Sequence, residues 1–506
     1  MDFRDSPNTT YKKTSLAKNG LEDCLASPKD SKQAKSTSQD FSDFHMRDLH
    51  KQDSHRHHSC RHDSHKTDSC QKDSRPKVYF KTFGCRTNLY DTQVMRQNLH
   101  DFEATLEESE ASIVVVNSCT VTNGADSGVR SYVRKIQSQG KKILFAGCGV
   151  GTQGKALFSQ NLVSGILGHS HKEHINIALK ALSQDKEVFY ADELGKKHLD
   201  STMIAEFVGK SRAFVKIQEG CDFACSYCVI PLVRGAARSY EIDSVRSQVQ
   251  SLIDSGISEV VLTGTNVGSY GKDKGTNIST LLKVLFKLDG LKRVRIGSLE
   301  PSQIDEEFLE LLGEEKFCRH LHIALQHTHD EMLSIMNRTN RFEADARLLE
   351  KIASLGYAIG TDFIVAHPGE SQAIWQEALA NAKSLPLTHI HPFIYSPRDG
   401  TKSANLIAQA KYPPIRGDVA KSRLHELQSA IKAKNRAFRE SKKAKNASLK
   451  ILIEKQLGGH YYGLDEFFNK IIIQSTPHTP LQTLSQPQWL AISDYEIKEE
   501  HNYAII

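Results

Sequence analysis

The sequence predicts an α/β protein with four parts: a disordered N-terminal tail, a doubly wound α/β domain, a partial (β/α)6 barrel and a small C-terminal β-barrel. Three observations predict this class. Strand-like apolar runs alternate with helix-like stretches from residue 77 to about residue 400, as in parallel sheets. The first 76 residues hold few large apolar side chains. The last sixty residues contain short strand-like runs and the Gly458–Gly459 pair, which is typical of a turn.

The composition is typical of a globular protein. Of the 506 residues, 39% are hydrophobic and 25% are charged. The chain has no run of about 18 or more apolar residues, so we expect no transmembrane helix and no membrane partner. It also shows no apolar segment of the kind found in secretory signals, so we expect a cytoplasmic protein. The net charge of +6 permits a polyanionic partner but does not require one.

Residues 1–76 form the predicted tail. They are rich in Ser, Asp, His and Lys, and they include seven histidines and three of the ten cysteines. Such a segment buries too little apolar surface to offset the entropy lost on folding. The stretch from His55 to Cys60 could bind zinc or nickel, but it lacks the ligand spacing typical of metal sites. The sequence therefore favours a solvated tail.

The doubly wound domain is predicted over residues 77–200. Three strand-like runs there each end next to a cysteine, namely Cys85, Cys119 or Cys148. The carboxyl ends of parallel strands meet at one edge of a sheet, where ligands bind. We therefore expect these thiols to converge, although 34 and 29 residues separate them. One such cysteine is usually a small buried hydrophobic residue, but three at equivalent positions could hold an iron–sulfur cluster. The runs are 78–83, 112–116 and 142–145, with helix-like stretches from residue 90 and over 125–139.

The partial barrel is predicted over residues 205–440. Six apolar runs alternate there with helical stretches, and the active sites of such barrels lie at the carboxyl ends of the strands. The runs are 214–217, 259–262, 294–296, 320–325, 362–365 and 391–395.

The sharpest motif is the triad Cys221, Cys225 and Cys228, on the loop after the first barrel strand. Zinc sites usually take four ligands in two pairs, and no fourth Cys or His lies nearby. Three thiolates can instead ligate three irons of a [4Fe–4S] cluster and leave the fourth iron open. An open iron can chelate S-adenosylmethionine, whose reductive cleavage yields a radical. A zinc site and a chance arrangement are the alternatives.

Both sets of cysteines, taken with their flanking residues, resemble the methylthiotransferase family of radical S-adenosylmethionine enzymes. Tyr227 occupies the aromatic position before the last cysteine of the triad. The resemblance covers about residues 77–440 and, more weakly, the C-terminal region. Its motifs are Thr82–Asn88, Asn117–Thr122, Gly147–Cys148, Lys216–Cys221, Val229–Pro231, Arg234–Gly235, Leu262–Asn266, Leu325–Gln326, Thr361–Ile364, Pro368–Glu370 and Tyr395–Thr401.

The resemblance implies two [4Fe–4S] clusters and an enzyme that attaches a methylthio group to an unactivated carbon. Cys85, Cys119 and Cys148 would hold the auxiliary cluster that carries the sulfur, and the triad would hold the cluster that cleaves S-adenosylmethionine. It further implies four contacts to S-adenosylmethionine, at Gly264, Asn266, Gln326 and Asp362. Packing and turn geometry are the alternative roles for these four residues.

Within the family, the segment Asn117–Asp126 is most similar to the MtaB-type branch. This resemblance implies that C2 of N6-threonylcarbamoyladenosine at position 37 of tRNA is methylthiolated. The implied partners are the tRNA anticodon loop, an electron donor such as flavodoxin or ferredoxin, and a sulfur donor. Isopentenyladenosine-37 tRNA and ribosomal protein S12 stay open as other substrates. A non-enzymatic iron–sulfur or metal-sensing protein is the alternative from a different class.

The C-terminal region, residues 446–506, resembles a TRAM domain, a small RNA-binding β-barrel. The helix-like stretch 411–445 before it has 11 Lys or Arg residues against 3 Asp or Glu residues. Such a stretch can neutralise RNA phosphates, although a Lys-rich helix is often only a solvated face.

Two segments depart from the family pattern. They place His327 and His367 where other members often have Ser and Phe, so contacts with substrate are one possible role. Loop histidines with partners in the protein are the favoured interpretation of both. Cys318 is interpreted as structural.

Overall fold

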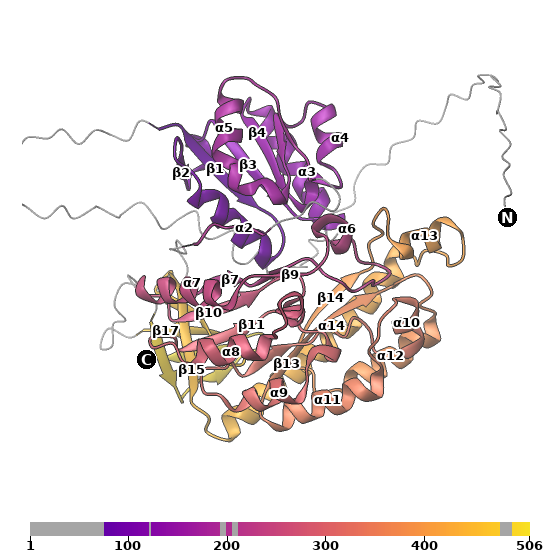
Figure 1. Ribbon diagram of the computed structural model, residues 1–506. Coiled ribbons are helices and arrows are strands. Elements are labelled where there is room, and N and C mark those ends of the chain that lie inside the picture. The colour runs from indigo at the N-terminus through magenta and orange to yellow at the C-terminus, as the bar shows by residue number, and fades with distance from the viewer. Residues whose placement is uncertain (1–74, 121–122, 193–198, 205–210, 476–487) are drawn as a thin grey trace, which may run out of the picture. The chain divides into compact units, whose positions relative to one another are not determined.

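The computed structural model describes residues 75–120, 123–192, 199–204, 211–475 and 488–506 (Figure 1). The predicted disordered tail lies almost entirely outside the described residues.

The first sheet has six parallel strands in the order β2-β1-β3-β4-β5-β6, which confirms the predicted doubly wound domain. The central strand β3 is buried along its whole length, as expected for a parallel strand covered on both faces. Val115 packs in the core on the side of α2 and α5, whereas Val114 and Val116 pack on the side of α3 and α4. The elements are β1 (Lys77–Thr82), α2 (Arg86–Gln97), β2 (Glu103–Thr105), β3 (Ile113–Ser118), α3 (Asn123–Ser138), β4 (Lys142–Gly147), α4 (Gly154–Ser159), β5 (Gly165–Leu167), α5 (Ile175–Ser183) and β6 (Val188–Tyr190).

The second unit is a partial barrel of six parallel strands, as predicted. Strands β7, β10 and β11 pair with one another, as do β12, β13 and β14. Isolated parallel bridges at Val294–Phe317 and Leu299–Ile323 join the two groups. The strands are β7 (Ala213–Lys216), β10 (Glu259–Thr263), β11 (Arg293–Ile296), β12 (His320–His322), β13 (Ala358–Val365) and β14 (His389–Ile394), with a short hairpin of β8 (Gln218–Glu219) and β9 (Arg238–Ser239) beside β7.

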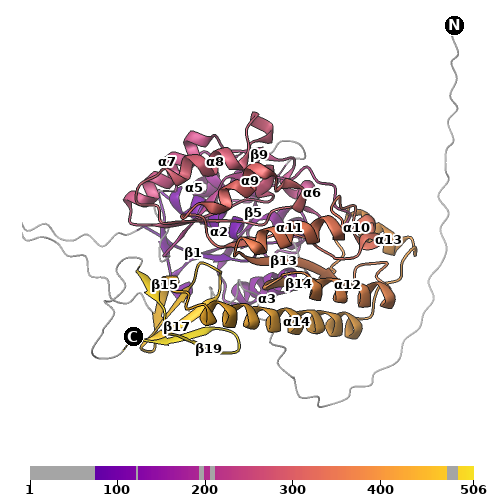
Figure 2. The same ribbon diagram turned by 90° about the horizontal axis from the view of Figure 1, so that it is seen from below.

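Helices cover the outside of this barrel (Figures 1 and 2). Their apolar faces pack with the strands in one large core, in which Leu282, Leu349 and Trp375 are at most 1% exposed. These helices are α7 (Ile242–Asp254), α8 (Ile278–Phe286), α9 (Glu306–Glu310), α11 (Phe342–Ser354), α12 (Gln372–Ser384) and α14 (Gly417–Ala444). The unit also contains α6 (Ile230–Arg234), α10 (Asp330–Ile335) and α13 (Lys402–Ala408).

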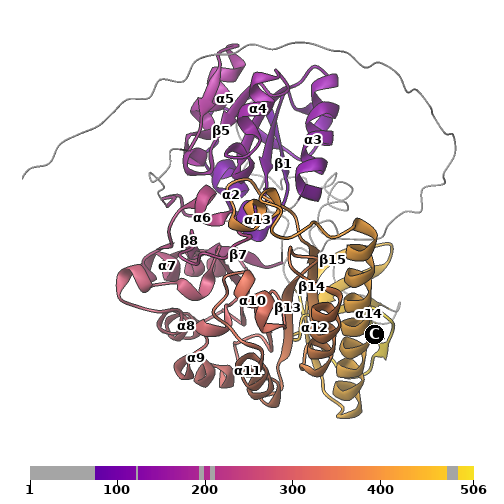
Figure 3. The same cartoon turned by 90° about the vertical axis from the view of Figure 1, so that its right-hand side faces the viewer.

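Long helix α14 runs along α12 and β14 to a C-terminal sheet (Figure 3). This sheet has the order β18-β15-β16-β17-β20-β19. Gly458 and Gly459 both have positive φ and form the turn between β15 and β16, as the sequence predicted. The sheet contacts the start of the barrel strands, where Trp489 donates a hydrogen bond to Ser258 Oγ at 2.8 Å. Its strands are β15 (Leu449–Leu457), β16 (His460–Leu464), β17 (Lys470–Gln474), β18 (Trp489–Ile492), β19 (Glu496–Ile497) and β20 (Asn502–Ile505).

Within the described residues, every helix is too short or too polar to cross a membrane.

Candidate functional site

The structure brings Cys85, Cys119 and Cys148 to one edge of the first sheet. They follow β1, β3 and β4, which are adjacent parallel strands. Gly84 has φ +99°, and a Cβ at this position would lie only 2.7 Å from Cys119 Sγ. Cys148 Sγ lies 3.8 Å from Asn88 Oδ1. The three thiols therefore converge around the first turns of α2.

Asn88 holds two of these cysteine loops together. Its Nδ2 donates to the carbonyl of Phe83 at 3.0 Å and to that of Ser118 at 2.9 Å. The side chain of Asn117 donates in turn to the Asn88 carbonyl at 2.8 Å. The loops after β1 and β3 are thus fixed to α2 by hydrogen bonds that need an amide at position 88.

An arginine of the barrel unit contacts this site. Arg234, at the end of α6, donates from Nε to Cys148 Sγ at 3.0 Å. Nη2 of the same guanidinium donates to Asn88 Oδ1 at 3.0 Å and to Asp91 at 2.8 Å. Its Nη1 forms an ion pair with Glu219. Burial raises the pKa of Cys148 to about 11, and the positive charge of Arg234 opposes this rise. The arginine therefore favours a thiolate, which is the form that binds iron.

A buried ion network joins the two α/β units beside Arg234. Lys216 of β7 lies 2.9 Å from Asp91, 2.6 Å from Asp200 and 3.5 Å from Glu219. Burial alone would lower the pKa of Lys216, but these three carboxylates outweigh it and raise the pKa well above its usual value. Lys172 pairs with Asp200 from the side of the first sheet. The charges balance only when both units are in place.

The second triad lies on the loop that follows β8. The Cys228 amide donates to the Cys225 carbonyl at 3.1 Å, so the loop is tightly turned. Burial raises the pKa of Cys228 to about 12, and the neighbouring thiols Cys225 and Cys221 add to the rise. All three cysteines are free of disulfides. Buried thiols become thiolates when a metal supplies the compensating charge, so this donor set fits an iron cluster.

Of the predicted contacts to S-adenosylmethionine, Asn266 is in direct contact with the triad. Its Nδ2 is 3.5 Å from Cys221 Sγ. Its Oδ1 is buried and has no hydrogen-bond partner among the described residues. A buried acceptor without a partner is satisfied when a ligand with a donor binds, as the ammonium or hydroxyl groups of S-adenosylmethionine would.

The other three predicted contacts occupy different surroundings. Gly264 follows β10, where a Cβ would lie 2.9 Å from the Gln218 carbonyl oxygen, so close packing requires glycine. Gln326 has φ +65°, and its backbone N–H donates to the Asp362 backbone carbonyl at 2.9 Å. The Asp362 carboxylate lies beside His322 and His391. Their roles as cofactor contacts stay predictions.

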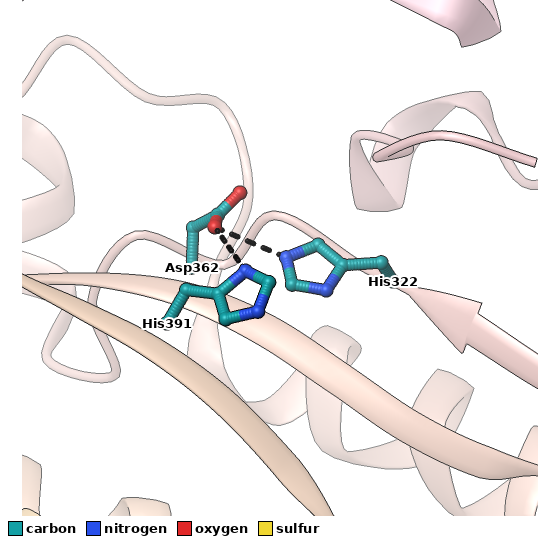
Figure 4. A group of neighbouring side chains, drawn as sticks. All are labelled: His322, Asp362 and His391. Carbon is teal, nitrogen blue, oxygen red and sulfur yellow. Dashed lines mark ion pairs between the residues drawn. The ribbon is translucent and has the colours of Figure 1, made fainter. Parts of the chain in front are cut away.

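Asp362 forms part of a polar group that the sequence reasoning missed (Figure 4). Its Oδ1 lies 3.1 Å from His322 Nε2 and 3.6 Å from His391 Nδ1. His322 and His391 also line a small pocket that is partly open to solvent. The remaining lining residues are Arg86, Arg295, Ile296, His320, His389 and Phe468. The sequence does hold one signal for this group. His320 and His322 are two residues apart, as are His389 and His391, and alternate residues of a strand share a face.

This trio could also hold a metal ion, because its ligand atoms all lie within 4.8 Å of one another. The positive charges of Arg86 and Arg295 in the same pocket oppose a divalent cation there. The trio is therefore better explained as hydrogen-bonding groups of the pocket than as a metal centre.

The residues interpreted as structural have partners within the protein. His367 is fully buried and lies 2.8 Å from Ser403 Oγ and 2.9 Å from the Pro368 carbonyl. His327 is also fully buried, 3.5 Å from Glu370. Cys318 accepts a hydrogen bond from Arg295 at 2.7 Å.

Comparisons with known proteins agree with this arrangement. Residues 77–168 match the family model described as "Uncharacterized protein family UPF0004", and residues 215–381 match the "Radical SAM superfamily". A Helicobacter pylori protein named "Putative methylthiotransferase" is 56% identical over 85% of this chain and 99% of that protein. The threonylcarbamoyladenosine tRNA methylthiotransferase MtaB of Aquifex aeolicus is 32% identical over 75% of this chain and 94% of that protein.

A solved structure shows the same fold. The radical S-adenosylmethionine methyltransferase TsrM of Kitasatospora setae, with cobalamin and a [4Fe-4S] cluster bound, superposes with a TM-score of 0.52 at 17% identity. The match covers 66% of this chain and 75% of that one.

The fold, the thiol triad and the family model define a radical S-adenosylmethionine enzyme. The two relatives named above match this chain over 99% and 94% of their own length. The chain therefore belongs to the methylthiotransferase family. It is therefore a transferase that uses S-adenosylmethionine and two [4Fe–4S] clusters.

Proposed function

We propose that this protein converts N6-threonylcarbamoyladenosine at position 37 of tRNA to its 2-methylthio derivative. Relatives named threonylcarbamoyladenosine tRNA methylthiotransferase MtaB support this substrate, at 32% identity in Aquifex aeolicus and 30% in Thermotoga maritima. A tRNA-2-methylthio-N(6)-dimethylallyladenosine synthase of Fervidobacterium nodosum is also 30% identical. Overall sequence identity therefore does not distinguish the two modified adenosines as substrates. The proposal of N6-threonylcarbamoyladenosine rests on the similarity of the segment Asn117–Asp126 to the MtaB-type branch.

One structural observation carries the two-cluster assignment. Helix α6 begins two residues after Cys228 and ends at Arg234, which donates to Cys148. The five residues of this helix span roughly 7.5 Å. Val229 and Val233 of the same segment pack against Cys148. One short helix thus connects the two thiol triads, as a reaction shared between two clusters requires.

We assign the auxiliary cluster to Cys85, Cys119 and Cys148, and the radical cluster to Cys221, Cys225 and Cys228. When bound, these groups supply the electron that cleaves one S-adenosylmethionine and the sulfur that takes a methyl group from another. Asn266 would orient S-adenosylmethionine. An electron donor and a sulfur donor complete the partners, and a tRNA substrate implies a cytoplasmic reaction.

Basic residues of α14 and the C-terminal sheet would contact tRNA. Two of the eleven basic residues of the predicted stretch serve the fold instead. Arg423 is buried and donates to the Glu370 carbonyl, and Arg439 is buried and donates to the carbonyls of Lys498 and His501. Exposed residues such as Lys421 and Lys443 are the better candidates for RNA phosphates.

Mass spectrometry of tRNA nucleosides tests the proposal. A strain that lacks this gene should lose 2-methylthio-N6-threonylcarbamoyladenosine and accumulate its unmethylthiolated precursor. Persistence of the methylthio nucleoside in that strain would show that the substrate is wrong. Loss of the methylthio dimethylallyl nucleoside instead would favour the other tRNA branch. In parallel, the reduced, reconstituted protein should form 5′-deoxyadenosine, which a metal-sensing protein would not.

A further inference from the structure

Three arginines lie at or near the start of the barrel strands, and one of them, Arg295, lines the pocket. Arg212, Arg293 and Arg295 share the carboxylate of Glu259, at 3.6, 3.2 and 2.6 Å. Arg212 also pairs with Glu454 at 2.7 Å. Asp465 and Glu466 also lie close enough to Arg295 to interact with its charge, so these three guanidinium groups already have carboxylate partners within the protein.

Two histidines of the pocket, His320 and His389, contribute hydrogen-bonding groups without charge near pH 7. Burial, followed by the neighbouring His391 and His322, lowers the pKa of His389 to about 3. Burial and His389 likewise hold the pKa of His320 well below its usual value. His320 Nε2 is buried, and it lacks a hydrogen-bond partner in the described part of the chain. These neutral imidazoles can donate to or accept from a polar ligand.

Arg86 differs from the other arginines of this region. It is the first residue of α2, and its guanidinium carbon lies 5.7 Å from the centre of the Phe468 ring, which also lines the pocket. Across the described ranges, neither a hydrogen bond nor an ion pair is found for this guanidinium. Arg295, in contrast, donates to Glu259 at 2.6 Å and to the Asp465 carbonyl at 2.7 Å. A half-buried guanidinium without an acceptor lowers stability unless a ligand supplies one.

We propose that Arg86 binds the carboxylate of the threonylcarbamoyl group on the substrate adenine and thereby selects the substrate. This inference rests on the proposed function, because the carboxylate belongs to that base. A guanidinium can bind a carboxylate through two parallel N–H···O bonds, which give both affinity and orientation. Since Arg86 follows Cys85 directly, a carboxylate held there anchors the base next to the thiols of the auxiliary site.

The same geometry selects against the substrate of the other tRNA branch. A dimethylallyl group has neither charge nor acceptor, so it would bury the Arg86 guanidinium without a partner. A site that binds a charged group discriminates strongly against a ligand without that group, because its own charge is then left unpaired. An apolar site discriminates less strongly between ligands of different size. Arg86 therefore accounts for a preference between the two adenosines that overall sequence identity leaves open.

Equilibrium binding of the reconstituted holoenzyme to anticodon stem-loop RNAs tests this role. Three RNAs differ only at position 37, which carries N6-threonylcarbamoyladenosine, its neutral carboxamide analogue or adenosine. Wild type should bind the acid about tenfold or more tightly than the carboxamide, as expected for a charge-assisted pair. Arg86→Gln should bind both equally, and Arg86→Lys should keep part of the preference. The matched control, Arg96→Gln near the other end of α2, should behave as wild type.

The outcomes separate this inference from the proposed function. An undiminished preference for the acid in Arg86→Gln overturns the role of Arg86 and leaves the proposed function standing. A wild type that does not distinguish the acid from adenosine contradicts the proposed function, and this inference with it. Iron content of Arg86→Gln should equal that of wild type. If it falls, Arg86→Lys decides: a reduced preference supports the role and an unchanged one overturns it.

Discussion

Arg234 shows how a single side chain can serve both packing and chemistry. It is 1% exposed, and its guanidinium donates to Cys148 Sγ, Asn88 and Asp91. Hydrogen bonds to a ligand sulfur tune the reduction potential of a cluster, and outer partners of this kind matter almost as much as the ligands. Arg86 presents the opposite case, since its guanidinium has no such set of partners. The contrast separates an arginine that builds the site from one that is available to a ligand.

Asp465 allows a test of how burial affects stability. Burial and the neighbouring Glu466 raise its pKa to about 7, although hydrogen bonds from Asn469 oppose the rise. Because the pKa is higher in the folded protein than in the unfolded chain, the carboxyl group stabilises the fold at low pH. That contribution is lost as the pH rises toward the folded-state pKa. Relative to Asp465→Asn, the melting temperature of wild type should therefore fall between about pH 4 and about pH 7.

Thermal melting followed by circular dichroism measures this difference. Asp243→Asn is the control, because the Asp243 side chain is 91% exposed on α7. Its effect on the melting temperature should be small and independent of pH. A pH-independent difference for Asp465→Asn as well would show that this carboxyl group does not titrate as proposed.

At the scale of elements, the loops that follow the strands decide whether the auxiliary site can form. Gly84 has φ +99°, and a Cβ there would overlap Cys119 Cβ. Gly147 has φ +88°, and a Cβ there would meet Asn117 Oδ1. Both loops thus need glycine for two reasons, the backbone conformation and the close approach of a neighbouring loop.

Gly84→Ala should remove the auxiliary cluster selectively. The added methyl group would displace the Cys119 loop, so that Cys85 and Cys119 no longer lie within reach of one cluster. Iron and sulfide should fall from about eight to about four of each per chain. Formation of 5′-deoxyadenosine should persist, because the triad on the barrel is untouched. Iron and sulfide analysis, together with quantification of 5′-deoxyadenosine, measures both effects.

Gly140→Ala separates backbone strain from the steric overlap. Gly140 also has positive φ, +72°, but a Cβ there would meet nothing within 4 Å. This variant should lose about 1 kcal/mol of stability and keep all its iron. If Gly84→Ala also kept its full iron content, the crowding at Cys119 would not matter for cluster assembly.

At the scale of the whole molecule, the alternation of strands and helices could be predicted from the sequence, and short-range geometry could not. All six predicted barrel strands are confirmed: β7, β10, β11 and β13 are buried along all or nearly all of their length, whereas β14 is only partly buried. The three-residue strands β2, β5 and β6 were missed, since three residues are too few to show a periodic pattern. Helix α2 begins at Arg86, earlier than predicted, because its first residues are mostly polar.

The candidate site divides in the same way. The six cysteines could be named from their spacing and from the strand ends they follow. The pocket lined by Arg86, His322 and His391 could not be predicted, because it depends on which strands become neighbours. The network between the two units was equally hidden, since Asp91 and Lys216 are 125 residues apart. Buried pairs of this kind depend on tertiary contacts that no local pattern encodes.

Lys216 provides the test of that network. Lys216→Met would leave Asp91, Asp200 and Glu219 short of one cation, and breaking a buried ion pair from one side typically costs about 3–5 kcal/mol. Hydrogen exchange should therefore become faster in α2 and β7 together, since these elements pack against each other. Lys283→Met is the control, because Lys283 and Glu307 form an exposed pair that contributes little to stability. Faster exchange confined to β7 would mean that the network stabilises the barrel alone and does not join the two units.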